Sequence, residues 1–455
     1  MTKLRTDDLI RVLRQHPRSG SAELCARLKG VSRATLTRAL KTLGDAVITA
    51  GGSRRTRYAL RRPLRGKHTP IPLYQIDEHG LGREIGQLSL TYPEGSHLEF
   101  QGSFRWPLDR AMSDGWFDTL LYPVLDMRPQ GFIGRNFAHA HALDLGVSDN
   151  PDDWSDDDLA HVLASTGHDQ PGNLILGEAA YRRFLDLLRT GEGRFLAESD
   201  VEARYIQEAE NAMRHGEAQS SAGGEFPKFT ASRHLHGKKV DVITKFSGAD
   251  DSPAVRRWSD LLVCEHLASL SMPRKLHVPA ADSAIHRYGG RTFLEVVRFD
   301  RHGDFGRSPV CTLSSLNAAL IGAGGGPWPK AARTLQTLGW LREADTVALI
   351  WWFGRLIGNS DMHDANLAFR PGLALAPAYD MLPMMYAPMR GGELPHTEFR
   401  PEPPLPAEAP IWRRAAEGAE YFWNLCAGDA RISADFRRIC DDNRRKLAFL
   451  LSRMQ

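Results

Sequence analysis

The C-terminal half of this 455-residue chain carries three polar residues whose types and spacing suit phosphoryl transfer. Asp361 and Asn366 stand five positions apart, and Asp380 follows fourteen positions later. One carboxylate can orient an attacking hydroxyl group, while a carboxamide and a second carboxylate can hold Mg²⁺ against phosphate oxygens. The spacing therefore predicts Asp361 as a catalytic base and Asn366 and Asp380 as metal ligands.

A lysine upstream fits the same chemistry. The alternating stretch at 240–246 predicts a strand that presents Lys245. Kinases use such a lysine to hold the α- and β-phosphates, and a helix carboxylate orients it. In the kinase catalytic-loop signature, the base and the asparagine are five positions apart, as Asp361 and Asn366 are here. Glu265, in a helix predicted at 258–270, is the first candidate partner and Asp260 the second. Taken alone, Lys245 is better explained as an exposed strand residue.

Small residues precede this strand. Ser220, Ser221, Gly223 and Gly224 form a loop whose backbone N–H groups could approach phosphate oxygens, although a Gly-Gly hairpin turn is the commoner explanation. Each signal is weak by itself. Their order, with loop, strand lysine, Asp/Asn loop and second aspartate in turn, favours a kinase.

The elements that carry these residues follow a basic N-terminal segment. Between Met1 and Lys67 the chain has 17 Lys and Arg residues against four acidic ones, so the remainder carries a net charge of −10. Such asymmetry is typical of a nucleic-acid module, although a charged segment is often only a solvated face. Apolar spacing predicts helices near 9–13 and after Ser21, and a third helix at 33–43 capped by Ser32.

This order predicts a winged helix-turn-helix whose third helix enters the major groove of DNA. Two strands, at 47–50 and 57–60, flank a basic loop that serves as the wing. A module that only contacts protein is the alternative, but arginines in both helix and wing favour DNA. The residues predicted to contact DNA are Arg33, Thr35, Thr37, Arg38, Lys41, Arg54 and Arg55.

The rest of the sequence narrows the class of protein. Stretch 71–98 predicts a small β-rich unit, and 172–177 predicts a short buried strand and not a phosphate loop. Five cysteines without a CxxC pair favour a reducing compartment and suggest no zinc site. We find no secretory signal and no apolar run of about 20 residues, and so we expect a cytoplasmic protein without membrane contact.

The motifs together resemble those of the HipA kinase family from residue 68 to 455. The resemblance rests on Ser221-x-Gly-Gly with Pro227-Lys228, on Arg298-Phe299-Asp300-Arg301, on Gly358-Asn-Ser-Asp361-x-His363-x-x-Asn366, and on Tyr379-Asp380. It implies an α+β fold with a kinase-like bilobal core. It also implies ATP and Mg²⁺ as cofactors, with Asp361 as base and Asn366 and Asp380 on the metal.

The resemblance implies further roles. Lys245, Ser221, Gly223 and Gly224 would bind ATP, and the stretch Glu295-Val296-Val297-Arg298 would form the hinge that contacts adenine. Ser221, or its neighbour Ser220, would be autophosphorylated, which switches such kinases off. His363 would orient the catalytic loop, although a satisfied core histidine is equally consistent with the sequence. A translation component such as an aminoacyl-tRNA synthetase is the substrate class that the family suggests.

Two departures from the family pattern stand out. Ala365 occupies the place where members often carry a lysine, so a phosphate contact is missing or supplied elsewhere. The usual toxin also relies on a separate DNA-binding antitoxin, whereas here both functions are predicted in one chain, as in HipA-domain proteins of the YjjJ type. The predicted domains are 1–62 (winged helix), 63–70 (basic linker), 71–200 (β-rich N-terminal subdomain), 201–300 (ATP-binding part) and 301–455 (helical lobe).

Two alternatives to the kinase remain at this point. The chain could be a DNA-binding regulator, dimeric on a palindrome, whose kinase-like domain is not catalytic. It could also be a Mg²⁺-dependent deoxyribonuclease that uses Asp361, Asp364 and Asp380, since paired carboxylates serve both chemistries. The strand lysine and the Ser-x-Gly-Gly loop are explained by a kinase and not by a nuclease.

Overall fold

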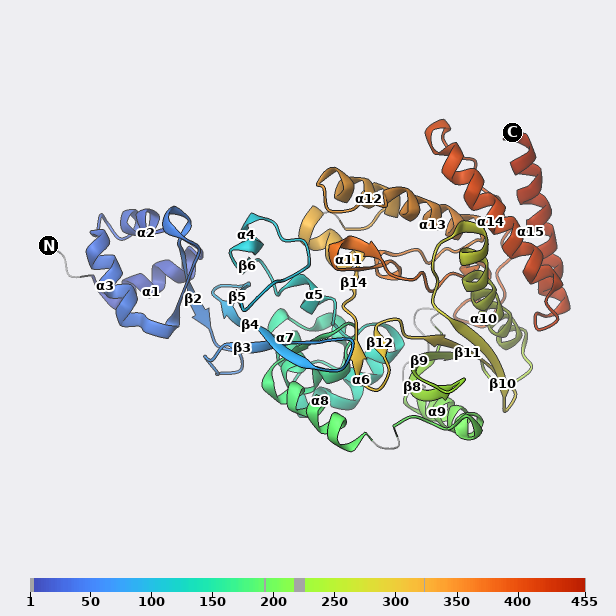
Figure 1. Cartoon of the computed structure of the whole chain (residues 1–455), viewed down its shortest axis with the longest axis horizontal. Helices are drawn as coiled ribbons and strands as arrows, with labels where there is room; N and C mark the ends of the chain where they lie inside the picture. The colour runs from blue at the N-terminus through green and yellow to red at the C-terminus, as the bar shows by residue number, and fades with distance from the viewer. Residues whose placement is uncertain (1–3, 192–193, 217–225, 323, 455) are drawn as a thin grey trace.

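The computed structural model describes residues 4–191, 194–216, 226–322 and 324–454. Ser220, Ser221, Gly223 and Gly224, predicted to bind phosphate, lie outside the described residues. Figure 1 shows an elongated molecule with the N-terminus at one end and helices α14 (Ala409–Gly428) and α15 (Ala434–Arg453) at the other. Within the described ranges, no helix is long and apolar enough to cross a bilayer.

Residues 4–62, the N-terminal unit, form three helices and an antiparallel hairpin. The third helix begins where predicted, because the hydroxyl group of Ser32 accepts a hydrogen bond from the backbone N–H of Thr35. The prediction for Ser21 was wrong by one position, since Ser21 is the first residue of its helix and Gly20 precedes it as the cap. The elements are α1 (Thr6–Gln15), α2 (Ser21–Arg27), α3 (Arg33–Leu43), β1 (Val47–Ala50) and β2 (Arg57–Arg62).

Strand β2 joins the N-terminal unit to the middle of the chain. It pairs with β4 (Gly82–Thr91) through Arg61↔Thr91 and Arg62↔Leu90, so both parts share one sheet. The predicted linker at 63–70 is therefore held in place, and Arg65 within it donates to Asp158 at 2.6 Å. Four arginine–aspartate bridges cross this junction: Arg18–Asp118, Arg55–Asp114, Arg62–Asp157 and Arg65–Asp158.

Residues 71–190, the middle unit, combine a sheet with helices. The sheet runs in the order β1-β2-β4-β3-β7, with β5 paired to β4 and β6 to β5. The β-rich unit expected at 71–98 and the strand expected at 172–177 are both present, but the subdomain is more helical than predicted. Its elements are β3 (Ile71–Ile76), β5 (Ser96–Phe100), α4 (Arg110–Ser113), β6 (Trp116–Phe117), α5 (Tyr122–Leu125), α6 (Gly131–Leu145), α7 (Asp156–Thr166), β7 (Leu174–Leu176) and α8 (Glu178–Thr190).

A second sheet, in the order β10-β11-β9-β8, lies between two helices. Alternation along its strands sends Phe246 and Phe293 into a cluster with α9, whereas Leu294 packs into the larger core with α10. Lys245 pairs with Leu294 across the strands and shares its face, toward α10. The elements are α9 (Val201–Gly216), β8 (Lys228–Leu235), β9 (Lys238–Phe246), α10 (Pro253–Ser271), β10 (Ser283–Tyr288) and β11 (Arg291–Val297).

The C-terminal lobe is mainly helical and contains most of the largest hydrophobic core. The apolar run predicted as helix or strand at 347–357 is a helix, α13 (Ala344–Leu356), and it ends at the loop that carries Asp361. A small sheet, β14-β15-β16, supports the other side of that loop. The remaining elements are β12 (Arg301–His302), β13 (Gly306–Arg307), β14 (Cys311–Thr312), α11 (Leu313–Leu316), α12 (Trp328–Thr337), β15 (Ala368–Arg370) and β16 (Ala374–Leu375).

Candidate active site

Lys245 is the centre of a buried ionic cluster. Its Nζ donates to both carboxylate oxygens of Glu265, at 2.7 and 2.8 Å, and to Oδ1 of Asp380 at 2.7 Å. The side chains of Lys245 and Glu265 are buried, and that of Asp380 is partly exposed. Strand β9, helix α10 and the loop after β16 thus bring together three residues that the sequence predicted to act together. Asp260, the second candidate partner, instead accepts bonds from Ser433.

The charges of this cluster stabilise one another. Burial alone would lower the pKa of Lys245, but the carboxylates of Asp380 and Glu265 raise it above its ordinary value. Burial would raise the pKa of Asp380, yet the charges of Lys245 and Lys228 lower it. Burial prevails for Glu265, whose pKa is raised. The arrangement keeps Lys245 positively charged and Asp380 ionised, as phosphate and metal binding require.

The predicted base lies on the exposed loop after α13. The side chain of Asp361 is 52% exposed, and Nε2 of His363 lies 3.7 Å from its Oδ1. His363 is itself 55% exposed, so the interpretation as a core histidine was wrong. A carboxylate that is open to solvent on one side and close to an imidazole is accessible to an incoming hydroxyl group.

Two asparagines shape the same loop. Asn359 accepts the backbone N–H of Asp361 at 3.0 Å and donates to the carbonyl oxygen of Asp380 at 3.3 Å, so it connects the two acidic segments. Asn366 donates through Nδ2 to the carbonyl oxygen of Asp361 at 2.9 Å. That bond orients the carboxamide oxygen of Asn366 as the atom left for a ligand. Asp380 has a left-handed backbone, with φ of +58°, which places its carboxylate beside Lys245.

These residues fit a nucleotide with Mg²⁺. A carboxamide oxygen from Asn366 and a carboxylate from Asp380 are the hard oxygen donors that Mg²⁺ prefers, and phosphate oxygens commonly complete such sites. Lys245 could supply a point charge for phosphate, and its bonds to Glu265 fix its direction. The donor set therefore matches the predicted cofactors, although Ser221 and the glycine loop lie outside the described residues.

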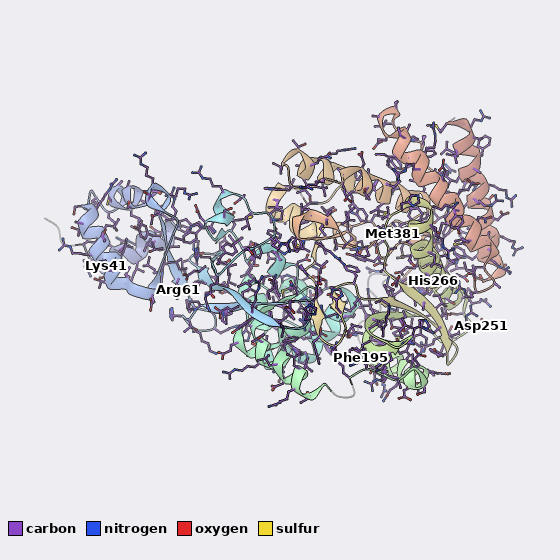
Figure 2. The ribbon with its side chains drawn as sticks, viewed as in Figure 1. Lys41, Arg61, Phe195, Asp251, His266 and Met381 are labelled. Atoms are coloured by element: carbon purple, nitrogen blue, oxygen red, sulfur yellow. The ribbon has the colours of Figure 1, made fainter. Side chains whose placement is uncertain are left out.

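A small pocket lies behind the ionic cluster. Its lining includes Glu265, Met272, Val296 and Asp380. Met381 also lines it, and His266 on α10 lies 2.9 Å from the hydroxyl group of the lining residue Ser283; both are labelled in Figure 2. The pocket is thus continuous with the ionic cluster and belongs to the same site.

The predicted hinge residues take positions around this pocket. The carboxylate of Glu295 points away from it, because it accepts from the hydroxyl group of Tyr205 at 2.5 Å and from Arg233 at 2.9 Å. The backbone N–H of Val297 donates to the carbonyl oxygen of Asp282 at 2.8 Å. Val296, inside the predicted hinge stretch, is the member whose side chain lines the pocket.

The residues predicted to contact DNA lie far from this site. Arg33, Thr37, Arg38 and Lys41 are exposed on α3, whereas Thr35 is half-buried against Ser32, whose hydroxyl is 2.9 Å away. Figure 2 shows Lys41 and Met381 well separated along the long axis of the molecule.

The two wing arginines differ in their surroundings. Arg54 is exposed and has no ion pair among the described residues, whereas Arg55 lies 3.6 Å from Asp114.

Sequence reasoning missed several supporting residues. Asn359 stands inside a quoted motif, and its position two residues before Asp361 was the available signal. Lys228 is the partner of Lys245 in the β8–β9 register, and its charge reaches Asp380. Asn317 donates to Asp364 at 2.7 Å, a contact 47 positions apart that nothing in the local sequence announces.

Comparison with known proteins fits this geometry. Residues 67–185 match the family model described as "YjjJ-like toxin, middle domain", and residues 220–445 match the "HipA-like C-terminal domain". Toxin YjjJ of Escherichia coli strain K12 is 35% identical over 449 residues, which cover 97% of both chains.

One solved structure supports a HipA-like fold, and a second is a weaker match. HipA of Shewanella oneidensis MR-1, solved in complex with HipB and operator DNA, aligns with a TM-score of 0.50 at 16% identity, over 84% of this chain and 97% of that one. The Helicobacter pylori proinflammatory kinase CtkA aligns with a TM-score of 0.35 at 11% identity, over 52% of this chain and 94% of that one. The high identity along nearly the whole chain shows that this protein belongs to the YjjJ-like toxins, which have a HipA-like C-terminal domain.

Proposed function

We propose that this protein is an ATP- and Mg²⁺-dependent serine/threonine protein kinase of the HipA toxin type, with its own DNA-binding domain. The observation that carries the proposal is the buried contact of Lys245 with both Glu265 and Asp380. Kinases bind ATP with a strand lysine that contacts a helix glutamate and a loop aspartate, next to a loop that carries an aspartate and an asparagine.

Each residue has a role in this proposal. Mg²⁺-ATP supplies the phosphoryl group and neutralises part of the charge that develops on it. Lys245 holds the α- and β-phosphates, while Asn366 and Asp380 hold the metal. Asp361 orients the attacking hydroxyl group of a serine or threonine and accepts its proton, and His363 holds Asp361 in position.

The substrates follow from the family. Ser221 or Ser220 would accept a phosphoryl group from the same chain, and this modification would regulate the enzyme. A translation component such as an aminoacyl-tRNA synthetase is the proposed external substrate class. We also propose that the protein acts in the cytoplasm, where a substrate of this class is found.

The N-terminal unit is proposed to be a winged helix-turn-helix that binds operator DNA. The order of α1, α2, α3 and the β1–β2 hairpin supports this, as do the exposed Arg33, Arg38 and Lys41 on α3. A palindromic operator would be bound by two copies. HipA of Shewanella oneidensis is in a complex with HipB and operator DNA. By analogy, this protein could bind an antitoxin partner in addition to its own DNA-binding domain.

The test is a transfer assay with γ-labelled ATP and Mg²⁺ on the full chain. Wild-type protein should acquire label at Ser221 or Ser220, and Asp361→Ala should acquire none. Asp118→Asn is the matched control, since Asp118 contacts Arg18 at the N-terminal junction. A wild-type protein that neither binds ATP nor transfers phosphate would refute the kinase.

The same preparations separate the alternatives. Cleavage of duplex DNA by wild type but not by Asp361→Ala would favour the deoxyribonuclease. ATP binding without transfer would favour a regulator with a non-catalytic kinase-like domain. Arg38→Ala should weaken DNA binding by about 1–3 kcal/mol if Arg38 contacts a base, and a chain without DNA affinity at low salt would remove the DNA-binding part of the proposal.

A further inference from the structure

Two carboxylates, one buried and one partly buried, connect the middle unit to the parts of the kinase core that surround the proposed ATP site. The first, Asp300, lies just after β11. Its carboxylate accepts from Arg298 at 3.0 and 2.9 Å, from Arg301 at 2.7 Å, and from the backbone N–H of Gly172 in the middle unit at 2.9 Å. Burial would raise the pKa of Asp300, but the two arginines lower it, so the carboxylate stays ionised.

Arg301 binds the same part of the middle unit. We call the contact of Asp300 and Arg301 with residues 169–172 the hinge junction. Its guanidinium donates to the carbonyl oxygens of Gly172 at 2.9 Å and Gln170 at 2.8 Å, and to the carboxylate of Asp169 at 2.9 Å. Arg307 lies 3.9 Å from the same carboxylate. Residues 169–172 of the middle unit are therefore held by a charged segment that begins where β11 ends.

The hinge junction acts on the nucleotide side of the site. Arg298 follows β11 directly, and its backbone N–H donates to the carbonyl oxygen of Asp241 on β9 at 2.9 Å. Strand β11 carries Val296, which lines the pocket beside Glu265. A shift of Asp300 would move the strand that forms the wall of that pocket.

The second carboxylate, Asp126, caps the end of α5 in the middle unit. It accepts from the backbone N–H of Thr312 at 2.9 Å, from the hydroxyl group of Thr312, and from the hydroxyl group of Ser315 at 2.7 Å. Burial raises the pKa of Asp126 despite these three donors. A partly buried carboxylate whose three donors all lie on a neighbouring unit is a rigid point of attachment.

We call the contact of Asp126 with Thr312 and Ser315 the loop junction. It supports the proposed catalytic loop, which carries Asp361 and Asn366. The segment that Asp126 holds pairs with β15 through Thr312↔Ala368, and Leu313 donates to the carbonyl oxygen of Leu367 at 2.7 Å. Leu367 follows Asn366 immediately. The loop junction thus reaches the predicted metal ligand through two successive hydrogen-bonded segments.

The catalytic loop is also held on the other side of Asn366. The hydroxyl group of Tyr379 donates to the carbonyl oxygen of Ala365 at 2.7 Å. The loop is therefore supported on both sides of Asn366.

We infer that the middle unit is a positioning element of the phosphotransferase, with Asp300 setting nucleotide affinity through the hinge junction and Asp126 setting the transfer rate through the loop junction. The inference rests on the proposed function. It assigns the middle unit a task within the reaction, and it makes Asp126 and Asp300 positioning residues that do not touch the substrate.

The experiment compares Asp126→Asn, Asp300→Asn and the control Asp118→Asn in the full chain. Label transfer from γ-labelled ATP gives the limiting rate constant and the half-saturating ATP concentration. Asp126→Asn should lower the rate constant at least tenfold and leave half-saturation within twofold. Asp300→Asn should raise half-saturation at least fivefold with a smaller effect on the rate. Asp118→Asn should change neither.

Hydrogen exchange measured by mass spectrometry provides the second readout, which needs no activity. Peptides covering 358–370 should exchange faster in Asp126→Asn, and peptides covering 291–298 faster in Asp300→Asn, with neither change in Asp118→Asn. If a variant fails to fold, Ser315→Ala and Arg301→Lys weaken the same junctions more gently and should give the same split in smaller measure.

The outcomes separate the two claims. A wild type without ATP binding refutes the proposed function, and the exchange data then decide the positioning inference alone. An active wild type whose two junction variants keep the wild-type half-saturation and lose rate only in proportion to lost folded protein overturns the inference. Unchanged exchange at both sites in folded variants overturns it as well.

Discussion

Lys245→Met would leave the carboxylates of Glu265 and Asp380 in a buried cluster without the ammonium group that they share. At 2.7 Å and an effective dielectric constant of about 20, each carboxylate attracts that ammonium by roughly 6 kcal/mol before desolvation is subtracted. Removing one partner of a buried pair costs roughly 3–5 kcal/mol. For a unit the size of the kinase core, this corresponds to a fall of roughly 10 °C in Tm.

A second substitution separates this cause from lost packing. Glu265→Gln removes one of the two carboxylates that Lys245→Met leaves without a cation. The double variant Lys245→Met/Glu265→Gln should therefore recover about half or more of the lost Tm. Differential scanning calorimetry of wild type, both single variants and the double variant measures the cycle. The Lys245→Met defect should also shrink as pH falls, because Glu265, whose pKa is already raised, then takes up a proton.

The result that would refute this reasoning is simple additivity. If the two single shifts in Tm add in the double variant, Lys245 and Glu265 do not interact in the way their distances imply. A Lys245→Met protein as stable as wild type at pH 7.5 would refute it equally. Loss of ATP binding is expected in the single Lys245 variant and in the double variant, so nucleotide affinity cannot substitute for the calorimetry.

Three further predictions concern separate parts of the molecule. Arg54→Ala should weaken binding to duplex DNA, measured by fluorescence anisotropy, more than Arg55→Ala, because Arg55 already faces Asp114; the reverse order would contradict this. Burial lowers the pKa of His97 to about 4. The unfolded chain therefore binds that proton more tightly, and about 2 kcal/mol of stability should be lost between neutral pH and pH 5. His97→Gln should show a flatter pH dependence in thermal unfolding, and parallel curves would exclude His97 as the source. Asp380→Asn, which tolerates the same left-handed backbone, should raise the half-saturating Mg²⁺ concentration in the transfer assay by at least about tenfold, and an unchanged Mg²⁺ requirement would remove Asp380 from the metal site.

Local patterns in the sequence predicted the elements that carry chemistry. Two of these predictions depend only on neighbouring residues, and both elements are present: the cap at Ser32 and the strand that presents Lys245. The pairing of Lys245 with Glu265 also followed, because a kinase-like order leaves few helix carboxylates to choose from. Asp260, five positions earlier, faces α15 instead, and helical spacing alone could not decide between them.

Contacts between distant segments could not be predicted in this way. Asp126 lies 186 positions from Thr312, and Gly172 lies 128 positions from Asp300. No periodicity or motif signals such a pair, since each partner alone resembles an ordinary turn residue. The same holds for the partners of Glu295, because Tyr205 and Arg233, which bind its carboxylate, lie 90 and 62 positions away.

The bridges at the N-terminal junction reduce the number of arginines in the basic segment that are available to bind a polyanion. Arg18, Arg55, Arg62 and Arg65 already face aspartates of the middle unit, so four of the cations counted in the basic segment are neutralised within the chain. Each phosphate contact contributes about −0.9 to the slope of log affinity against log salt concentration. With these four arginines committed, the slope for any polyanion should be shallower by roughly 3–4 units than the composition alone suggests. Ionic strength would then act twice, by screening the polyanion and by loosening the bridges that keep these arginines occupied.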